Sequence, residues 1–267
     1  MSISSIQSRQ NPRIKHLVKL RNRSERNRHN EFLIEGLREL SHALDCQKPL
    51  KELYFCSDYF RNDEAALLID KAQELTIPLI ELTPSVFDKI THRESPDGLL
   101  GVAQTWETSL KEIKLSSNPL LVIADSIEKP GNLGSLMRSV EATGADALIL
   151  CNPITDIFNP NVVRASQGLL FSLPIVVASA EEIHTFLKEN TIHLIATTPQ
   201  ASTHYWDADL RQPTAILMGS EKDGLDEHWL NQADTQVTIP LEGKADSLNI
   251  STAAVLTLYE ALRQRKG

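Results

Sequence analysis

The chain has 267 residues, 41% of them hydrophobic, and a formal net charge of −8. The length allows one large domain or two ordinary ones, and the apolar content can bury a core, which excludes general disorder. Three widely spaced cysteines exclude a disulfide framework, and no apolar run approaches the roughly 18 residues that a transmembrane helix needs. With no apolar secretory region near the N-terminus, we expect a soluble, cytoplasmic protein.

The first 30 residues form a basic segment. They contain eight lysines and arginines against one acid, Glu25, so they carry +7 while the rest of the chain carries −15. A basic segment on an acidic body is typical of local contact with nucleic-acid phosphates. A solvated helix face or an organellar transit peptide would show the same charge. The candidate phosphate-binding residues are Arg9, Arg13, Lys15, Lys19, Arg21, Arg23 and Arg26.

Residues 1–105 are predicted to form a compact α/β domain. Asn11 followed by Pro12 predicts the start of a helix whose apolar face contains Ile14, Leu17 and Val18. Strands are then predicted over residues 32–34, 52–56, 77–81 and 98–104, and helices over residues 35–44, 63–74 and 84–90. A polar, serine-containing stretch predicts a linker over residues 106–117.

Residues 118–267 are predicted to form a second α/β domain. Strands are expected at 120–124, 147–151, 175–177, 193–196, 215–218 and 236–239, and helices at 133–143, 160–170, 180–189, 226–232 and 248–264. Most of these strands are continuous apolar runs that alternate with helical segments. This pattern predicts a mostly parallel sheet that is covered by helices on both faces.

The common nucleotide and metal motifs are missing. The chain contains no G-x-x-x-x-G-K-[ST] and no G-x-G-x-x-G after a strand, so it offers neither a P-loop nor a Rossmann dinucleotide fingerprint, which disfavours a nucleotide-using enzyme. The eight histidines are scattered without zinc spacing, so we expect no metal. The absence of G-x-S-x-G argues against an α/β-hydrolase.

Three stretches combine the end of a strand with glycines and polar side chains. They are PLLVIADSIEKPGNLGSLMRSVEATGA (119–145), ILMGSEKDGL (216–225) and IPLEGKADSLNISTAAV (239–255). Taken singly, each polar residue has a plainer explanation as a helix cap, a loop carboxylate or a surface charge. Since parallel strands end at one edge of a sheet, the three loops are expected to share a rim. The rim residues are Asn132, Arg138, Glu221, Ser247 and Asn249.

These stretches resemble motifs one, two and three of the SpoU (TrmH-type) branch of the SPOUT RNA methyltransferases. The matching residues are N-x-G-x-x-x-R at Asn132–Arg138, G-x-E-x-x-G-L at Gly219–Leu225, and I-P-x-x-G-x-x-x-S-L-N-(V/I)-S at Ile239–Ser251. Ile250 replaces the more usual valine, and Lys222-Asp223 stands where small residues are common. NPRIKHLVKL and FLIEGLREL, in the N-terminal half, resemble the family's substrate-binding domain, which is similar to a ribosomal protein that binds RNA kinks.

The resemblance implies a trefoil-knotted catalytic domain, a homodimer, and methyl transfer from S-adenosylmethionine to a ribose 2′-hydroxyl in RNA. Main-chain groups around Gly219, Ile239 and Leu248 would hold the cofactor, and the five rim residues would surround the acceptor ribose. Because a guanidinium with a pKa above about 12 is a poor base, we expect Arg138 to orient phosphate and ribose instead.

The type of N-terminal domain favours ribosomal RNA as substrate over transfer RNA. Two other classes stay open on the sequence alone. One is a non-catalytic RNA-binding protein with a degenerate methyltransferase fold, and the other is a nucleotide-using enzyme on a doubly wound sheet.

Overall fold

The computed structural model describes residues 3–267, and its contacts divide the chain into two units. Unit 1 comprises the described residues up to Trp106 together with Asp156–Ser172, and unit 2 comprises Glu107–Thr155 and Leu173–Gly267. Helix α7 (Pro160–Ala165) packs against strand β2 (Glu31–Glu35) within unit 1.

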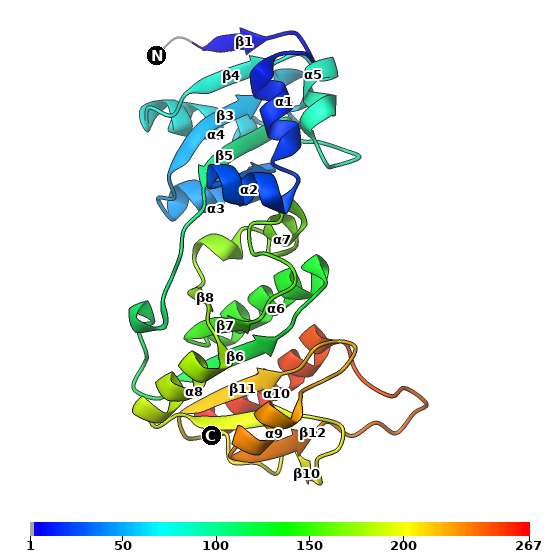
Figure 1. Cartoon of the computed structure of the whole chain (residues 1–267). Coiled ribbons are helices and arrows are strands. Elements are labelled where there is room, and N and C mark those ends of the chain that lie inside the picture. Colours follow the sequence, from blue (N-terminus) through cyan, green and yellow to red (C-terminus); the bar gives the residue numbers. More distant parts are fainter. Residues whose placement is uncertain (1–2) are drawn as a thin grey trace. The chain divides into compact units, whose positions relative to one another are not determined.

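Unit 1 is built on a five-stranded mixed sheet with the order β1-β4-β3-β5-β2 (Figure 1). Strand β5 runs antiparallel to β2 and β3, while β1, β4 and β3 are parallel. Its other strands are β1 (Ser4–Ile6), β3 (Leu50–Phe55), β4 (Leu79–Leu82) and β5 (Leu99–Gln104). Besides α7, its helices are α1 (Pro12–Lys19), α2 (Arg23–His29), α3 (Leu37–Asp45), α4 (Asp63–Glu74) and α5 (Pro84–Ile90), with short 3-10 turns at Ser57–Tyr59 and Leu169–Phe171.

The basic segment is an integral part of this unit. The Asn11 side chain caps α1 by accepting a hydrogen bond from the Arg13 backbone N–H at 2.9 Å, as its sequence predicted. Ile14, Leu17 and Leu20 are buried in the core against the sheet. Charge on this segment therefore lies on the outer faces of packed helices and not on a loose arm.

Arg26, which we predicted to be a phosphate-binding residue, is buried in unit 1. Its side chain is only 2% exposed, and it donates to the carbonyl oxygens of Leu20 (3.0 Å) and Arg21 (2.7 Å). It also forms a 2.5 Å ion pair with Asp156. A guanidinium with these three partners holds the fold together and is not available to RNA.

Unit 2 contains a seven-stranded sheet in which every strand pair is parallel, with the order β10-β12-β9-β11-β6-β7-β8. Its strands are β6 (Leu120–Asp125), β7 (Ala147–Cys151), β8 (Ile175–Val177), β9 (His193–Thr197), β10 (Thr203–His204), β11 (Thr214–Met218) and β12 (Thr235–Thr238). Its helices are α6 (Pro130–Thr143), α8 (Ala180–Glu189), α9 (Glu227–Gln232) and α10 (Ile250–Lys266), with a 3-10 turn at Leu110–Glu112.

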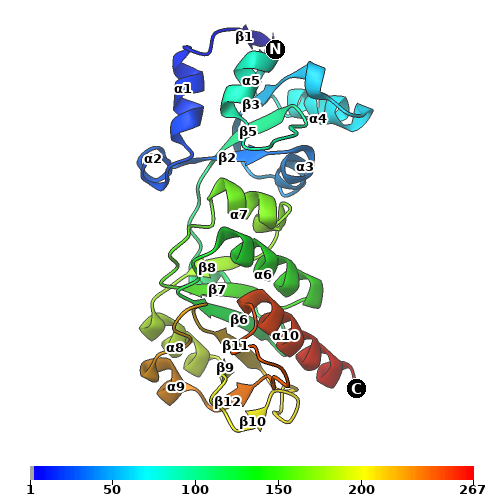
Figure 2. The same ribbon diagram turned by 90° about the vertical axis from the view of Figure 1, so that its right-hand side faces the viewer.

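Helices cover both faces of this sheet, which confirms the predicted architecture. Helices α8 and α9 contribute Ile183, Leu187 and Trp229 to a core cluster with Leu121 and Ile123 of β6. Helices α6 and α10 pack against each other on the other face (Figure 2). Within residues 3–267, no helix is long and apolar enough to cross a membrane, and no group of three or more potential ligands could hold a metal ion.

Candidate active site

The three motif loops lie at one edge of the sheet in unit 2. Strands β6, β11 and β12 are parallel members of the same sheet, so their carboxyl ends point the same way. Each of these ends is followed by one of the three motifs. The parallel order therefore brings together side chains that are up to 117 residues apart in sequence.

Three of the predicted rim residues form a continuous hydrogen-bonded chain. The Asn249 amide donates through Nδ2 to Oδ1 of Asn132 at 2.9 Å. The Asn132 amide donates in turn to Oε1 of Glu221 at 2.6 Å. The second carboxylate oxygen of Glu221 lies 3.4 Å from the backbone N–H of Glu128. One side chain from each motif thus ties the three loops to one another.

The Asn249 side chain also caps helix α10. Its Oδ1 accepts hydrogen bonds from the backbone N–H of Ser251 at 2.9 Å and from the Ser251 hydroxyl at 2.6 Å. It is therefore the N-cap of α10, and the capping bond satisfies one of the free N–H groups of the helix start.

The two glycines of the second motif close a tight turn. Ser220 and Gly224 exchange backbone hydrogen bonds of 3.1 and 3.2 Å, and Gly224 has a φ of +71°. A Cβ on Gly219 would lie 2.3 Å from the carbonyl carbon of Gly224. A larger residue at Gly219 would have to move the backbone, whereas one at Gly224 would be strained by the positive φ. The turn holds Glu221 toward Asn132.

A cavity of about 420 Å³ lies beside this network. Five of the predicted site residues line it: Gly219, Glu221, Ser247, Ile239 and Leu248. The volume falls in the usual range for a small-molecule site. The hydroxyl of Thr197 is buried next to the cavity without a hydrogen-bond partner among the described residues. A polar, amphipathic cofactor such as S-adenosylmethionine therefore fits the residues that are present.

The sequence reasoning missed one wall of this cavity. Thr197 is the last residue of β9, and Thr198 and Gln200 follow it. All three line the cavity, yet none of them was predicted as a site residue. Strand β9 lies between β11 and β12 in the sheet. Knowledge of that strand order would have placed its end between two motif loops.

Arg138 is not part of the network. It lies on α6 two turns after Asn132, its side chain is exposed, and its guanidinium makes no hydrogen bond or ion pair with any residue from 3 to 267. It does not line the cavity either. The structure thus leaves its guanidinium open to an external ligand.

The remaining predicted phosphate-binding residues differ in the contacts and the exposure of their side chains. Arg9 donates to the Ser85 carbonyl at 2.8 Å, and Arg21 donates to the carbonyls of Lys89 and Thr91 at 3.0 and 3.1 Å. A 3.9 Å ion pair joins Arg13 to Glu52, but the Arg13 side chain stays 54% exposed. Lys15, Lys19 and Arg23 are also exposed.

Comparison with protein families gives two adjoining matches. The sequence model of the SpoU rRNA Methylase family matches residues 119–259, which contain all three motifs. The model of an MRM3-like substrate binding domain matches residues 11–101.

Similar proteins cover almost the whole chain. A 23S rRNA (uridine(2479)-2′-O)-methyltransferase of Streptomyces viridochromogenes is 34% identical over 92% of this chain and 87% of its own length. A 23S rRNA (guanosine(2553)-2′-O)-methyltransferase, RlmP of Bacillus subtilis, is 29% identical over 96% of this chain and 98% of its own.

Solved structures agree with these relatives. A crystal structure of an RNA 2′-O ribose methyltransferase is 41% identical, with a TM-score of 0.86 over 98% of this chain and 100% of its own. The AdoMet-bound rRNA methyltransferase of Sinorhizobium meliloti is 29% identical, with a TM-score of 0.89 over 98% of both chains. The motifs, the fold and these matches together establish that the chain belongs to the SpoU rRNA methylase family.

Proposed function

We propose that this chain transfers a methyl group from S-adenosylmethionine to a ribose 2′-hydroxyl of ribosomal RNA. The observation that carries the proposal is the Asn249–Asn132–Glu221 chain, which joins the three family motifs beside the 420 Å³ cavity. The relatives named as 23S rRNA 2′-O-methyltransferases, together with the substrate-binding domain matched at residues 11–101, favour ribosomal over transfer RNA.

The cofactor site is assigned to the cavity of unit 2. When bound, S-adenosylmethionine supplies an electrophilic sulfonium methyl group. Main-chain groups at Gly219, Ile239 and Leu248 hold it, since all three residues line the cavity. The buried Thr197 hydroxyl offers a further hydrogen bond there.

Asn132, Glu221, Ser247 and Asn249 form the polar rim that positions the acceptor ribose. Methyl transfer needs the acceptor oxygen in line with the reacting methyl group, so the rim has to be rigid. The 2.6 Å bond from Asn132 to Glu221 supplies that rigidity because a carboxylate acceptor makes a strong hydrogen bond.

Arg138 orients the RNA backbone. A guanidinium is in general a poor base, but it can bind a phosphate through two parallel N–H groups. Its exposed position and its lack of partners within the described part of the chain support this role.

The exposed basic residues of α1 and its neighbours supply sequence-independent RNA affinity. Deleting this segment would not test the idea, since Ile14, Leu17 and Leu20 belong to the core. The surface variant R13Q/K15Q/K19Q removes three exposed positive charges and leaves the buried apolar residues in place. It should flatten the salt dependence of RNA binding and leave cofactor binding unchanged. An unaltered salt slope would rule out this contribution.

The homodimer and the trefoil knot that the family resemblance implies remain part of the proposal. Sedimentation equilibrium of the purified protein measures the first. A dimer would be supported by a mass near twice 29.8 kDa.

A map of ribose methylation in cellular RNA tests the function as a whole. Cells without this protein should lose one 2′-O-methyl site in 23S ribosomal RNA, and the purified protein should bind S-adenosylmethionine in calorimetry. Loss of a site in transfer RNA would move the substrate assignment there. If no site is lost and no cofactor binds, the chain is an RNA-binding protein with an inactive methyltransferase fold.

A further inference from the structure

The turn of the second motif carries two charged residues that have no part in the Asn249–Asn132–Glu221 chain. Lys222 and Asp223 follow Glu221 at the tip of this turn, and both line the 420 Å³ cavity. Their side chains are exposed, and neither forms an ion pair or a side-chain hydrogen bond with any residue from 3 to 267. A ligand in the cavity therefore meets two charged groups whose capacity for hydrogen bonds is unused.

The backbone of the turn fixes where these two side chains begin. The backbone N–H of Asp223 donates to the Ser220 hydroxyl oxygen at 3.0 Å. Ser220 and Gly224 also exchange backbone hydrogen bonds, so the three residues between them form a closed loop. Because the loop is held in one shape before a ligand arrives, little backbone order has to be gained on binding.

The charged residues of the cavity lining have different tasks. Of the 20 described residues that line the cavity, Lys222 is the one with a cationic side chain, and the acids are Glu221 and Asp223. Glu221 is engaged by the 2.6 Å hydrogen bond from Asn132. Asp223 is thus the lining carboxylate that is left for a ligand. The cavity offers one positive and one negative group at adjacent positions of the chain.

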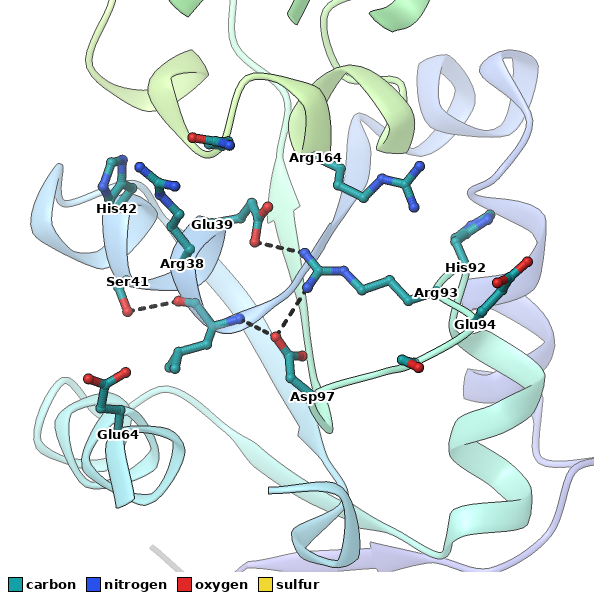
Figure 3. Close-up of a pocket in the computed structure, with 13 residues that line it drawn as sticks. Arg38, Glu39, Ser41, His42, Glu64, His92, Arg93, Glu94, Asp97 and Arg164 are labelled. Carbon is teal, nitrogen blue, oxygen red and sulfur yellow. Dashed lines mark hydrogen bonds and ion pairs between the residues drawn. The ribbon is translucent and has the colours of Figure 1, made fainter. Parts of the chain in front are cut away.

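The central charges of the larger cavity in unit 1, of about 1160 Å³, are arranged differently. There Arg93 donates to the Glu39 carboxylate at 2.9 Å and to the Asp97 carboxylate at 3.2 Å (Figure 3). These opposite charges satisfy one another within the chain. Lys222 and Asp223 are neighbours in sequence but form no such pair. Two opposite charges that stay apart are suited to a ligand that carries both signs itself.

We propose that Lys222 binds the carboxylate, and Asp223 the α-ammonium group, of the amino-acid end of S-adenosylmethionine. The proposal rests on the proposed function for the identity of the cofactor. S-adenosylmethionine carries both charges on one carbon atom, at the end opposite to its adenosine. Both lose hydration in the cavity, and the pair of side chains replaces the lost hydrogen bonds. The pair therefore makes the cavity selective for a zwitterionic cofactor over adenosine derivatives without an amino-acid end.

The variant K222Q/D223N tests the proposal, because it removes both charges, leaves the net charge unchanged and alters only exposed side chains. The probes are S-adenosylhomocysteine and 5′-methylthioadenosine, which share the adenosine and the thioether sulfur, while only the first has an amino-acid end. Calorimetry of the full chain measures both affinities without RNA. The variant should bind S-adenosylhomocysteine about tenfold more weakly and 5′-methylthioadenosine as the wild type does.

The single variants decide which charge binds which group. Decarboxylated S-adenosylmethionine keeps the ammonium group and lacks the carboxylate. Lys222→Gln should therefore bind this analogue as the wild type does, whereas Asp223→Asn should bind it about threefold more weakly. Both single variants should bind S-adenosylmethionine itself more weakly. A loss of analogue binding in Lys222→Gln, or none in Asp223→Asn, would overturn the assignment.

The matched control is K244Q/D246N in the loop of the third motif. Lys244 and Asp246 are exposed and lie outside the cavity lining, and the double substitution again leaves the net charge unchanged. This control should bind both probes with wild-type affinity. The proposal is overturned if K222Q/D223N keeps its affinity for S-adenosylhomocysteine, if it loses as much affinity for 5′-methylthioadenosine, or if the control loses as much as the variant.

Cofactor binding and ribosomal RNA methylation by the wild-type protein separate this result from the proposed function. If the wild type binds S-adenosylmethionine and methylates RNA, while K222Q/D223N keeps the wild-type ratio of affinities for the two probes, only the assignment of Lys222 and Asp223 fails. If the wild type binds neither S-adenosylmethionine nor its analogues, the proposed function fails and this assignment fails with it.

Discussion

The hydrogen bond between Asn132 and Glu221 is the most informative contact to remove, because it joins the first motif to the second beside the cavity. The substitution Glu221→Ala deletes the acceptor of the 2.6 Å bond and the weaker 3.4 Å contact with the Glu128 N–H. A hydrogen bond to a charged group contributes about 1.5–3 kcal/mol. Since Glu221 is half-buried, the lower end applies.

We therefore expect E221A to bind S-adenosylmethionine about tenfold more weakly, which corresponds to about 1.4 kcal/mol. Glu221→Gln keeps an acceptor for Asn132 and should lose less. Glu227→Ala, at an exposed position in the first turn of α9, is the matched control and should bind the cofactor normally. Isothermal titration calorimetry of the four proteins measures the affinities directly and does not depend on an RNA substrate.

A double-mutant cycle decides whether the two side chains act as a unit. If they do, N132A and E221A should each weaken binding, and the double variant should be little worse than either. Additivity within about 0.5 kcal/mol would show that Asn132 and Glu221 act independently, which would refute the reasoning from their contact. Wild-type affinity in E221A would refute it as well.

Three further outcomes follow from other parts of the structure. Arg138→Lys should bind the cofactor normally but lose most of its kcat, since an ammonium cannot reproduce bidentate phosphate contact; retention of most of the kcat would contradict the orienting role. Arg26→Met should lower the free energy of unfolding by about 3–5 kcal/mol in urea denaturation, because Asp156 is left as an unpaired charge; a loss below about 1 kcal/mol would contradict the buried-pair assignment. Burial, followed by a hydrogen bond with Asp125, raises the pKa of the Cys151 thiol to about 12. At pH 8 only about one Cys151 in ten thousand is a thiolate, so iodoacetamide should label the more accessible Cys46 first; rapid labelling of Cys151 in the native protein would show that its environment is different.

The elements that could be predicted are those with a clear apolar pattern. The predicted ranges 63–74, 84–90 and 147–151 coincide with α4, α5 and β7. Helix α2 was missed for a physical reason. Its sequence RSERNRH contains no apolar residue, and the one side chain that it buries is Arg26. Strand β1 was missed because only Ile6 of its three residues is buried.

The charge pattern of the first 30 residues also could not show which basic side chains are buried. In the sequence, Arg26 is one of eight basic residues in a segment, and nothing in their spacing separates it from Arg23 or Arg28. The structure separates them through Asp156, which lies 130 residues further along the chain. Long-range pairing of this kind is set by tertiary contacts, which a local charge count does not contain.

The residue types of the three motifs explain why Asn249, Asn132 and Glu221 form one hydrogen-bonded chain in this order. An amide can donate and accept at once, so Asn249 and Asn132 can each pass a hydrogen bond on to the next group. A carboxylate can only accept, so Glu221 has to stand at the end of the chain of donors. Asn249 also caps α10 through its oxygen, a task that serine or aspartate would perform equally well. Neither of those side chains carries an NH₂ group for Asn132, however, so the combined demands of helix capping and site assembly select asparagine at this position.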